Sequence, residues 1–193
     1  MEASRLRSSF ETERFVLKSL NIWQALQVTG SWRKDPQVLR ALFPFREPKT
    51  LFDWYLRGPI PRSPRRFVYS ITPKGETQPI GANTVKLFGH RSAFGVVAIH
   101  DRSWWGKDVV VEVRAELMNQ FFRHTTVERF YGQVEASNVA SIFCYRKLGF
   151  SHVDTWRAKQ TDPVTGEAID FVNFEIFRDE WLAGRFWRDE NAG

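Results

Sequence analysis

The spacing of apolar and polar residues divides the chain into a helix-rich first part and a strand-rich middle part. After a short strand at 13–20, apolar residues recur at helical spacing, and Gly58-Pro59 ends the last helix of this part. Apolar runs bounded by turn residues then predict strands, the first two of which form a hairpin. The helices are expected at 21–28, 35–43 and 47–58, and the strands at 66–73, 79–88 and 92–100.

In the second half of the chain, helices and strands alternate. The pattern predicts a helix at about 109–124, a strand at 127–135, a helix at 138–149, strands at 150–159 and 169–177, and a helical or frayed tail. A strand, a helix and another strand in succession over 92–135 favour a parallel strand pair. We therefore expect an α/β fold of the α+β type, with a mixed, mostly antiparallel sheet flanked by helices. The length of 193 residues suits a single domain, 1–193.

Composition and charge exclude several classes of protein. The chain is 42% hydrophobic, and no segment approaches the roughly 18 consecutive apolar residues that a membrane span requires. The first residues lack the apolar centre of a secretory signal, and Cys144 is the single cysteine, so we expect a cytoplasmic protein. The net charge of +6 is spread along the chain without a nucleic-acid-binding motif, so a nucleic-acid partner is not expected. The eight tryptophans are dispersed, which favours packing in the core and in grooves.

The segment WGKDVVVEVRAEL, at 105–117, has the character of a turn that enters a helix. The start of a helix presents unpaired N–H groups and the positive end of a dipole, which attract phosphate, and Lys107 adds a positive charge. Asp108 supports a different interpretation, because an aspartate at this position is also a good N-cap that would occupy the same N–H groups. The local spacing does not decide between them.

A second motif, NVASIFCYRKLGF at 138–150, is more specific. Asn138, Ser141 and Tyr145 are spaced by three and four residues, which places them on one stripe of a helix. Asn138 is explained as an N-cap, and Gly149 as a left-handed helix terminator. Tyr145 has no such structural explanation, and it lies beneath the carboxyl end of the expected parallel strand, where ligands commonly bind.

Together these two motifs resemble those of the GCN5-related N-acetyltransferase (GNAT) family, particularly its ribosomal-protein-alanine acetyltransferase branch. The resemblance covers a core of about 12–181 and leaves 182–193 as a tail. Glu112 matches the family's helix glutamate, whereas Val113 replaces its usual alanine. Two further departures are Asp108, where the family usually has glycine, and Val110, where it has glycine or alanine.

The resemblance implies a mixed sheet whose two central parallel strands splay apart, with acetyl-coenzyme A in the gap. It implies that N–H groups of the turn hold the pyrophosphate, that the pantetheine runs beside the strand at 92–100, and that Tyr145 lies near the sulfur. No metal ion is expected. The implied cofactor-binding residues are Val97, Ala98, Ile99, Trp105, Gly106, Lys107, Asp108, Val109, Val110, Val111, Asn138 and Ser141.

Acetyl transfer to an amine needs a deprotonated nucleophile, donors to the developing oxyanion, and a proton for the leaving thiolate. Backbone N–H groups near Ile99 and His100 are candidates for the oxyanion donors, and Tyr145 is the candidate acid. The strand at 92–100 carries no carboxylate, so His100 is the first candidate base and Glu135 the second. A histidine at the end of a strand is also commonly structural.

Phosphate binding in this turn further requires that the Asp108 carboxylate turn away. We expect it to cap the helix from outside or to pair with Lys107 or Arg102.

The acceptor is expected to enter between the segment 22–57 and the loop at about 160–168. Candidate aromatic lining residues, each of which also suits the core, are Trp23, Phe43, Phe45, Trp54, Tyr69 and Trp156. The basic balance disfavours a polyamine and favours a protein N-terminus or an anionic, nucleotide-linked amino sugar. The chain is expected to act as a monomer or homodimer. The alternative is a degenerate acyl-coenzyme A-binding or protein-interaction module without turnover, motivated by Asp108, Val110 and the missing strand carboxylate.

Overall fold

One eight-stranded sheet organises the protein. The computed structural model describes residues 6–43, 47–89, 91–162 and 165–188. The strands lie in the order β1-β2-β3-β4-β5-β6-β8-β7, and each pair is antiparallel except β5 with β6. Their bounds are β1 Ser9–Glu11, β2 Phe15–Ser19, β3 Arg66–Pro73, β4 Gly81–Phe88, β5 Ser92–Ile99, β6 Arg129–Glu135, β7 Ser151–Thr161 and β8 Ala168–Phe177.

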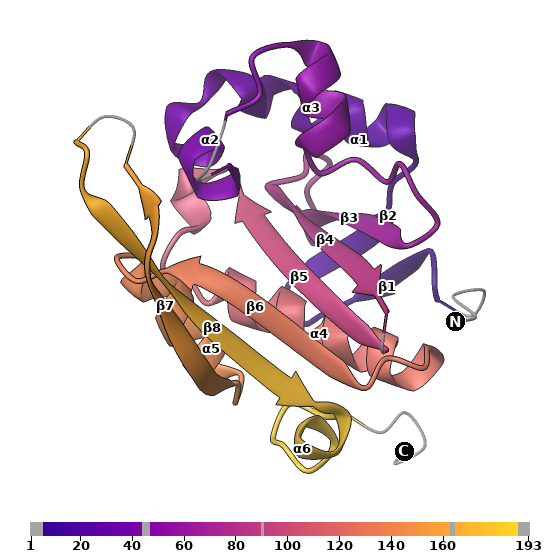
Figure 1. Cartoon of the computed structure of the whole chain (residues 1–193). Helices are drawn as coiled ribbons and strands as arrows, with labels where there is room; N and C mark the ends of the chain where they lie inside the picture. Colours follow the sequence, from indigo (N-terminus) through magenta and orange to yellow (C-terminus); the bar gives the residue numbers. More distant parts are fainter. Residues whose placement is uncertain (1–5, 44–46, 90, 163–164, 189–193) are drawn as a thin grey trace.

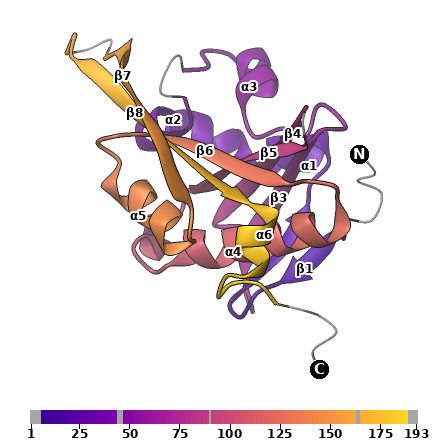
Figure 2. The same cartoon turned by 60° about the horizontal axis from the view of Figure 1, so that its bottom comes forward.

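Helices cover both faces of this sheet (Figure 1). The first face carries α1, η1, α2 and α3, whereas α4 and α5 lie behind the sheet, as the turned view in Figure 2 also shows. The bounds are α1 Ile22–Thr29, η1 Gly30–Lys34, α2 Pro36–Leu42, α3 Leu51–Arg57, η2 Arg102–Trp104, α4 Val109–His124, α5 Val139–Lys147 and α6 Arg178–Leu182. Among the described residues, no helix is both long and apolar enough to cross a bilayer.

The alternation of side chains along the strands builds one core on each face of the sheet. Val68 on β3 and Ala82 on β4 pack with Trp54 beneath the first helices. Tyr69 on β3 and Val85 on β4, each an odd number of positions away, point the other way and pack in the core that contains α4. Successive strand residues face opposite sides, so β3 and β4 contribute to both cores.

Within the residues that the structure describes, the sheet has one parallel strand pair, and it opens there. β5 and β6 pair only from Ser92–Phe94 with Arg129–Tyr131. Beyond this point β5 stays paired with β4 as far as Ile99, and β6 stays paired with β8 as far as Glu135. The two strands therefore separate toward their carboxyl ends, and the sequence-based expectation of a mixed, mostly antiparallel sheet with a splayed central parallel pair is confirmed (Figure 1).

Candidate active site

Two left-handed residues shape the turn that leads into α4. Gly106 has φ 72°, and Asp108 has φ 58° and ψ 14°. Left-handed backbone favours glycine, and aspartate is among the few other residues that tolerate it. The Asp108 side chain makes no capping hydrogen bond to the first turn of α4, so the interpretation of Asp108 as a conventional N-cap was wrong.

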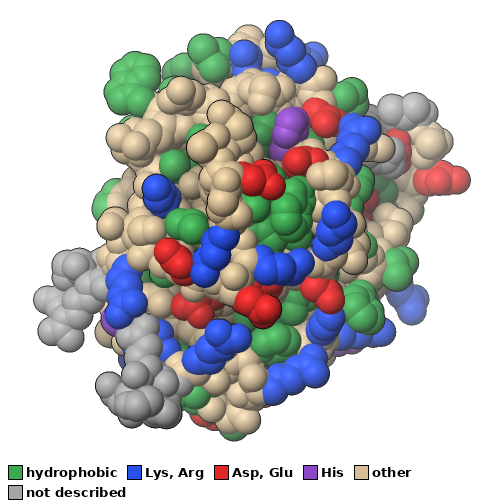
Figure 3. Space-filling view, turned by 180° about the vertical axis from the view of Figure 1, so that it is seen from behind, with side chains coloured by type: hydrophobic (Ala, Val, Ile, Leu, Met, Phe, Trp, Pro, Cys, Tyr) green, Lys and Arg blue, Asp and Glu red, His purple; other side chains and the backbone are tan. Residues whose placement is uncertain are grey.

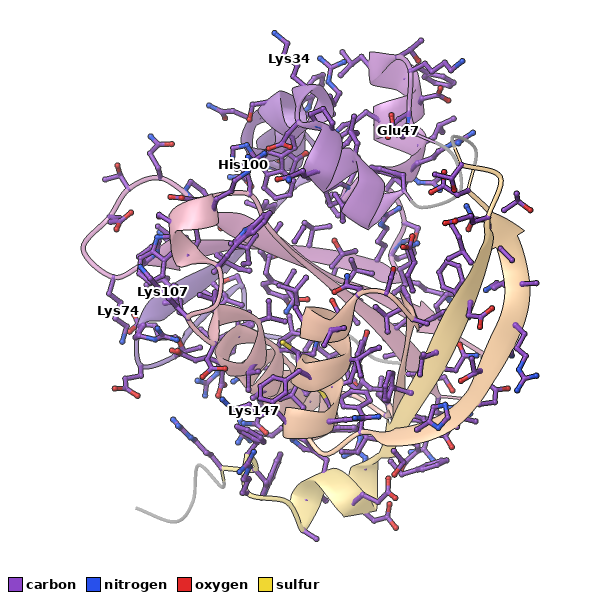
Figure 4. The ribbon with its side chains drawn as sticks, turned by 90° about the vertical axis from the view of Figure 1, so that its left-hand side faces the viewer. Lys34, Glu47, Lys74, His100, Lys107 and Lys147 are labelled. Carbon is purple, nitrogen blue, oxygen red and sulfur yellow. The ribbon has the colours of Figure 1, made fainter. Side chains whose placement is uncertain are left out.

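The Asp108 carboxylate pairs instead with α5. Lys147 donates a hydrogen bond of 2.7 Å from Nζ to Asp108 Oδ2. The partners expected from the sequence are engaged elsewhere, since Lys107 lies over the Trp104 ring and Arg102 pairs with Asp35 at 3.2 Å. Figure 4 shows Lys107 and Lys147 on the same side of the molecule as the start of α4. The carboxylate is thus held by α5 rather than by the N–H groups of α4.

Glu112 fixes this turn to the first strands. Its carboxylate accepts hydrogen bonds from Thr12 Oγ1, from the Arg14 amide at 2.9 Å and from Arg14 Nε at 2.6 Å. Arg14 Nη2 also donates to the Lys107 carbonyl at 2.9 Å. Burial alone would raise the pKa of Glu112, but the hydrogen bonds from Thr12 and Arg14 and the charge of Arg14 hold it below its usual value. Reasoning from the sequence missed Thr12 and Arg14, because their contact with Glu112 spans about half the chain.

A groove runs along α4 beside this turn. Figure 3 shows this rear face with basic and acidic side chains interspersed rather than gathered by sign. The residues that line the groove are Thr12, Glu13, Arg14, Asp108, Val111, Glu112, Ala115, Glu116, Asn119, Lys147, Phe186 and Arg188. The pair of Asp108 and Lys147 therefore lines this groove together with Thr12, Arg14 and Glu112, which hold the turn.

The part of β5 that no longer pairs with β6, here called the β5 arm, presents every second backbone amide to the gap between the two strands. The His100 amide donates to the Ile80 carbonyl at 2.8 Å, on the β4 side. The Ile99 carbonyl faces the other way and accepts a 3.0 Å hydrogen bond from Trp105 Nε1. Because N–H groups alternate along a strand, the amides of Val97 and Ile99 face the gap, whereas those of Ala98 and His100 face β4. The His100 amide is thus not an oxyanion donor, which corrects that part of the expectation.

His100 and Glu135 stand near the carboxyl ends of the two separated strands. The His100 ring stacks on Trp32 of η1, with centroids 5.7 Å apart and planes 7° apart. This contact lies on the face of the sheet that carries the first helices (Figure 4). Glu135 ends β6, and its carboxylate accepts a long hydrogen bond of 3.4 Å from Ser137. Both candidate bases therefore border the same opening, one on each arm.

Tyr145 reaches the opening from the other face. Its ring stacks on Phe174 at 4.9 Å and is 5% exposed. A Cβ atom placed on Gly132 would lie 2.1 Å from the Tyr145 hydroxyl oxygen, so the hydroxyl rests directly on the backbone of β6. The Arg114 guanidinium lies 4.5 Å from the ring centroid. Tyr145, Arg114 and Gly95 line one small cavity where β5 and β6 begin to separate.

The helix that carries Tyr145 begins at Asn138. The Asn138 side chain accepts a 3.0 Å hydrogen bond from the Ser141 amide, as the N-cap interpretation predicted. Gly149 adopts φ 88° just after the helix, as expected for a left-handed terminator. The Ser141 side chain is half-buried, so the stripe of Asn138, Ser141 and Tyr145 runs from the surface inward.

The structure places the aromatic residues expected to line the acceptor pocket in different surroundings. Trp54 is fully buried and donates to Thr29 Oγ1 at 3.0 Å, and Tyr69 is buried in the core beside α4, so both are core residues. Burial raises the pKa of Tyr69 to about 12. Phe43 packs on Trp54, while Trp23 and Trp156 are 81% and 48% exposed. Phe45 lies outside the described residues, as do residues 163–164 of the expected acceptor loop.

Residues 14–151 match the sequence profile of the acetyltransferase (GNAT) domain. The chain belongs to the GNAT acetyltransferase family. Comparison with curated proteins finds no match. The match of the profile covers the turn, α4, the strand opening and the helix of Tyr145.

Solved GNAT structures share the fold. A GNAT acetyltransferase from Bacillus anthracis superposes with a TM-score of 0.71 at 14% identity, covering 89% of this chain and 99% of that chain. A ribosomal-protein-S5-alanine acetyltransferase from Vibrio fischeri gives 0.72 at 17%, covering 91% and 99%. A spermidine N-acetyltransferase from Vibrio cholerae, in complex with CoA and spermine, gives 0.72 at 17%, covering 87% and 98%. At these identities the likeness concerns the fold and leaves the acceptor open.

GNAT enzymes use acetyl-coenzyme A, and the residues present fit this co-substrate. The first turn of α4 has no side-chain cap, so its N–H groups are free to face a pyrophosphate. The gap between β5 and β6 exposes the amides of Val97 and Ile99 to a pantetheine chain. When bound, the co-substrate supplies an activated acetyl thioester.

Proposed function

We propose that this GNAT enzyme acetylates a primary amine, either a protein N-terminus or a small-molecule amine such as an amino sugar. The observation that carries the proposal is the Asp108 side chain, which pairs with Lys147 and leaves the start of α4 without a side-chain cap. The sequence departure at Asp108 was one of three arguments for a degenerate module, beside Val110 and the missing strand carboxylate, and the pairing of Asp108 with Lys147 weakens that one argument. The resemblance to the ribosomal-protein-alanine branch makes a protein N-terminus the first acceptor to test.

The proposed chemistry divides among groups on the two sides of the sheet. Tyr145 protonates the departing sulfur, and a phenol suits this task because it is about as weak an acid as a thiol. The Ile99 amide, which faces the gap, donates to the carbonyl oxygen as negative charge develops there. His100 or Glu135 takes the proton of the incoming amine, directly or through water. The nitrogen thereby gains the acetyl carbon, and the carbon–sulfur bond breaks.

Two measurements on the full chain test this function. Isothermal titration with acetyl-coenzyme A measures cofactor binding, and a thiol-release assay over a panel of primary amines measures transfer. We expect binding together with thiol release on at least one amine. Binding without release on any amine would favour the degenerate acyl-coenzyme A-binding module, and absence of binding would reject both functions.

A further inference from the structure

A bulge in β7 directs the side chain of Lys159 toward the face of the sheet that carries the first helices. This is the face on which we expect the acceptor, and it is called the acceptor side below. Between Trp156, which pairs with Phe171, and Gln160, which pairs with Ile169, residues 157–159 face only Asp170 on β8. Ala158 at the centre of this bulge adopts a left-handed φ of 46°, and its amide donates to Asp170 Oδ1 at 2.7 Å. Bulges near functional sites commonly redirect a side chain, and left-handed backbone is unfavourable for alanine. We therefore infer that the bulge serves to set the direction in which a neighbouring side chain points.

That side chain is Lys159. Its ammonium lies 4.1 Å from the centroid of the Trp156 ring and 5.1 Å from that of Phe171, and it donates a hydrogen bond to Gln133 Oε1 on β6. Gln133 is held in turn by Asn173, to which it donates at 2.6 Å. The aromatic faces and the amide oxygen orient the positive charge over β6. Burial lowers the pKa of Lys159, so an anion bound there would stabilise its charged form.

The position of Lys159 follows from the alternation along β6. Gly132 faces α5, because the Tyr145 hydroxyl rests on it, so the adjacent Gln133 faces the opposite side of the sheet. His100 and its partner Trp32 lie on that same side, at the end of the β5 arm. Figure 1 shows the β7–β8 hairpin rising past the end of β6 on the side of α2. Lys159 therefore borders the acceptor side of the opening from the β6 arm.

We propose that Lys159 binds a carboxylate on the acceptor, so that the preferred substrates are primary amines that also carry a carboxylate. This inference rests on the proposed acetyltransferase function and names the chemical class of its acceptor. Glu135 lies on the same face and at the end of β6, where it suits the amino group of such a substrate. Two further acids lie on β7 and β8: Asp154 accepts hydrogen bonds from Trp156 and Asn173, and Asp170 accepts one from the Ala158 amide. A polyamine, which carries only positive groups, is repelled by Lys159.

Matched pairs of amines test the proposal. The two members of a pair differ only in that one carries a carboxylate and the other a carboxamide. One arm of the experiment uses small amino acids, and the other uses dipeptides with an acidic or amidated second residue. We expect the wild-type enzyme to favour the carboxylate member by about tenfold or more in kcat/KM, since a charge-assisted hydrogen bond is lost with the carboxamide. Lys159→Met keeps the aliphatic packing and should bring the ratio close to one, with the carboxamide rates little changed. The arm with the larger ratio identifies the source of the carboxylate.

The control is Arg157→Met, which removes an exposed positive charge from the same bulge and should leave the ratio unchanged. Isothermal titration of the enzyme with the acetylated product of the fastest carboxylate-bearing amine gives a second readout that does not depend on turnover. Lys159→Met should lower the affinity for this product about tenfold. A wild-type ratio near one, an unchanged ratio in Lys159→Met, or an equal loss on both members of a pair would overturn the proposal. Thiol release on amines without a carboxylate preference rejects this inference alone, whereas no release on any amine rejects the proposed function.

Discussion

At the scale of single residues, Asp108 shows how backbone conformation changes the meaning of a charge. From the sequence, its carboxylate looked like an obstacle to phosphate at a helix start. The structure gives it a left-handed backbone, which explains why glycine is common at this position, and a lysine partner on α5. Neither property is visible in the local sequence, because Lys147 lies 39 positions further along the chain.

Replacing Asp108 tests whether its charge still opposes the pyrophosphate. We expect Asp108→Gly to leave the affinity for coenzyme A unchanged or to raise it by up to about fivefold, the effect of removing one charge near a helix end. Asp108→Asn is the control, because asparagine tolerates the left-handed backbone and lacks the charge. Isothermal titration provides the affinities. A tenfold or larger loss in both variants would mean that the carboxylate contributes directly to binding.

Gly132 is a second single residue on which the site depends. Gly132→Ala forces the Tyr145 hydroxyl to move, since the new Cβ would lie 2.1 Å from it. We expect a loss of about 1–3 kcal/mol in the free energy of unfolding from overpacking, together with at least a tenfold fall in turnover.

The control for Gly132→Ala is Gly95→Ala on β5, where a new Cβ meets no atom within 4 Å, so its unfolding free energy should change by less than about 0.5 kcal/mol. Denaturant titration and the thiol-release assay measure the two effects. Wild-type stability and turnover in Gly132→Ala would show that Tyr145 does not depend on this contact.

At the scale of elements, Glu112 links the start of α4 to the β1–β2 connection. Its hydrogen bonds to Thr12 and Arg14, and that from Arg14 to the Lys107 carbonyl, hold the turn, the helix and the first strands together. The position of the phosphate turn thus depends on a contact outside the motif. We expect this contact to make the turn rigid before any ligand binds.

The pH dependence of stability tests this link. The pKa of Glu112 is lower in the folded protein than its usual value of 4.5, so its contribution is present above about pH 4.5 and is lost as the pH falls through the folded value. Glu112→Gln should reduce the free energy of unfolding at neutral pH by about 1–3 kcal/mol and flatten its decline in acid. Glu116→Gln, one turn along α4, serves as the control. Chemical denaturation between pH 3 and 7 measures the free energy of unfolding of both variants. If this free energy declined in acid as steeply in Glu112→Gln as in the wild type, the link would be contradicted.

Comparison of sequence and structure shows which elements follow from local pattern. The strand at 66–73 and the helix at 109–124 were predicted with their observed bounds, because turn residues and apolar spacing mark both ends. The three-residue strand β1 and the two 3₁₀ helices were missed, since they are too short to show a period. The bulge that directs Lys159 was missed as well, because the register of β7 depends on its pairing with β8.

The candidate site divides in the same way. The stripe of Asn138, Ser141 and Tyr145 was predicted from helical spacing, and the N-cap bond of Asn138 was confirmed. The roles of these residues in catalysis and cofactor binding remain proposals. Contacts between distant elements, such as Arg14 with Glu112 or Arg114 with Tyr145, were not predictable, because single-sequence patterns carry no information on tertiary neighbours.

At the scale of the whole molecule, the proposed function depends on two strands that separate from each other while each stays hydrogen-bonded to another strand. β5 remains bonded to β4 and β6 to β8, so the opening exposes backbone amides without leaving either strand unsupported. Tyr145 reaches this opening from the face of α5, whereas His100 and Lys159 border it on the other face. In the proposed function, the fold thus separates the side of the thioester from the side of the acceptor.

The comparison of wild type with Tyr145→Phe tests the central claim most directly. Thiol release is measured with acetyl-coenzyme A and the fastest amine of the panel, and isothermal titration measures the affinity for coenzyme A. Because Tyr145 is proposed to donate a proton in the reaction rather than to bind the co-substrate, turnover should fall by about a hundredfold or more while the affinity stays within about threefold. Equal turnover in the variant, or a parallel loss of affinity and turnover, would contradict the proposed role of Tyr145 in acetyl transfer.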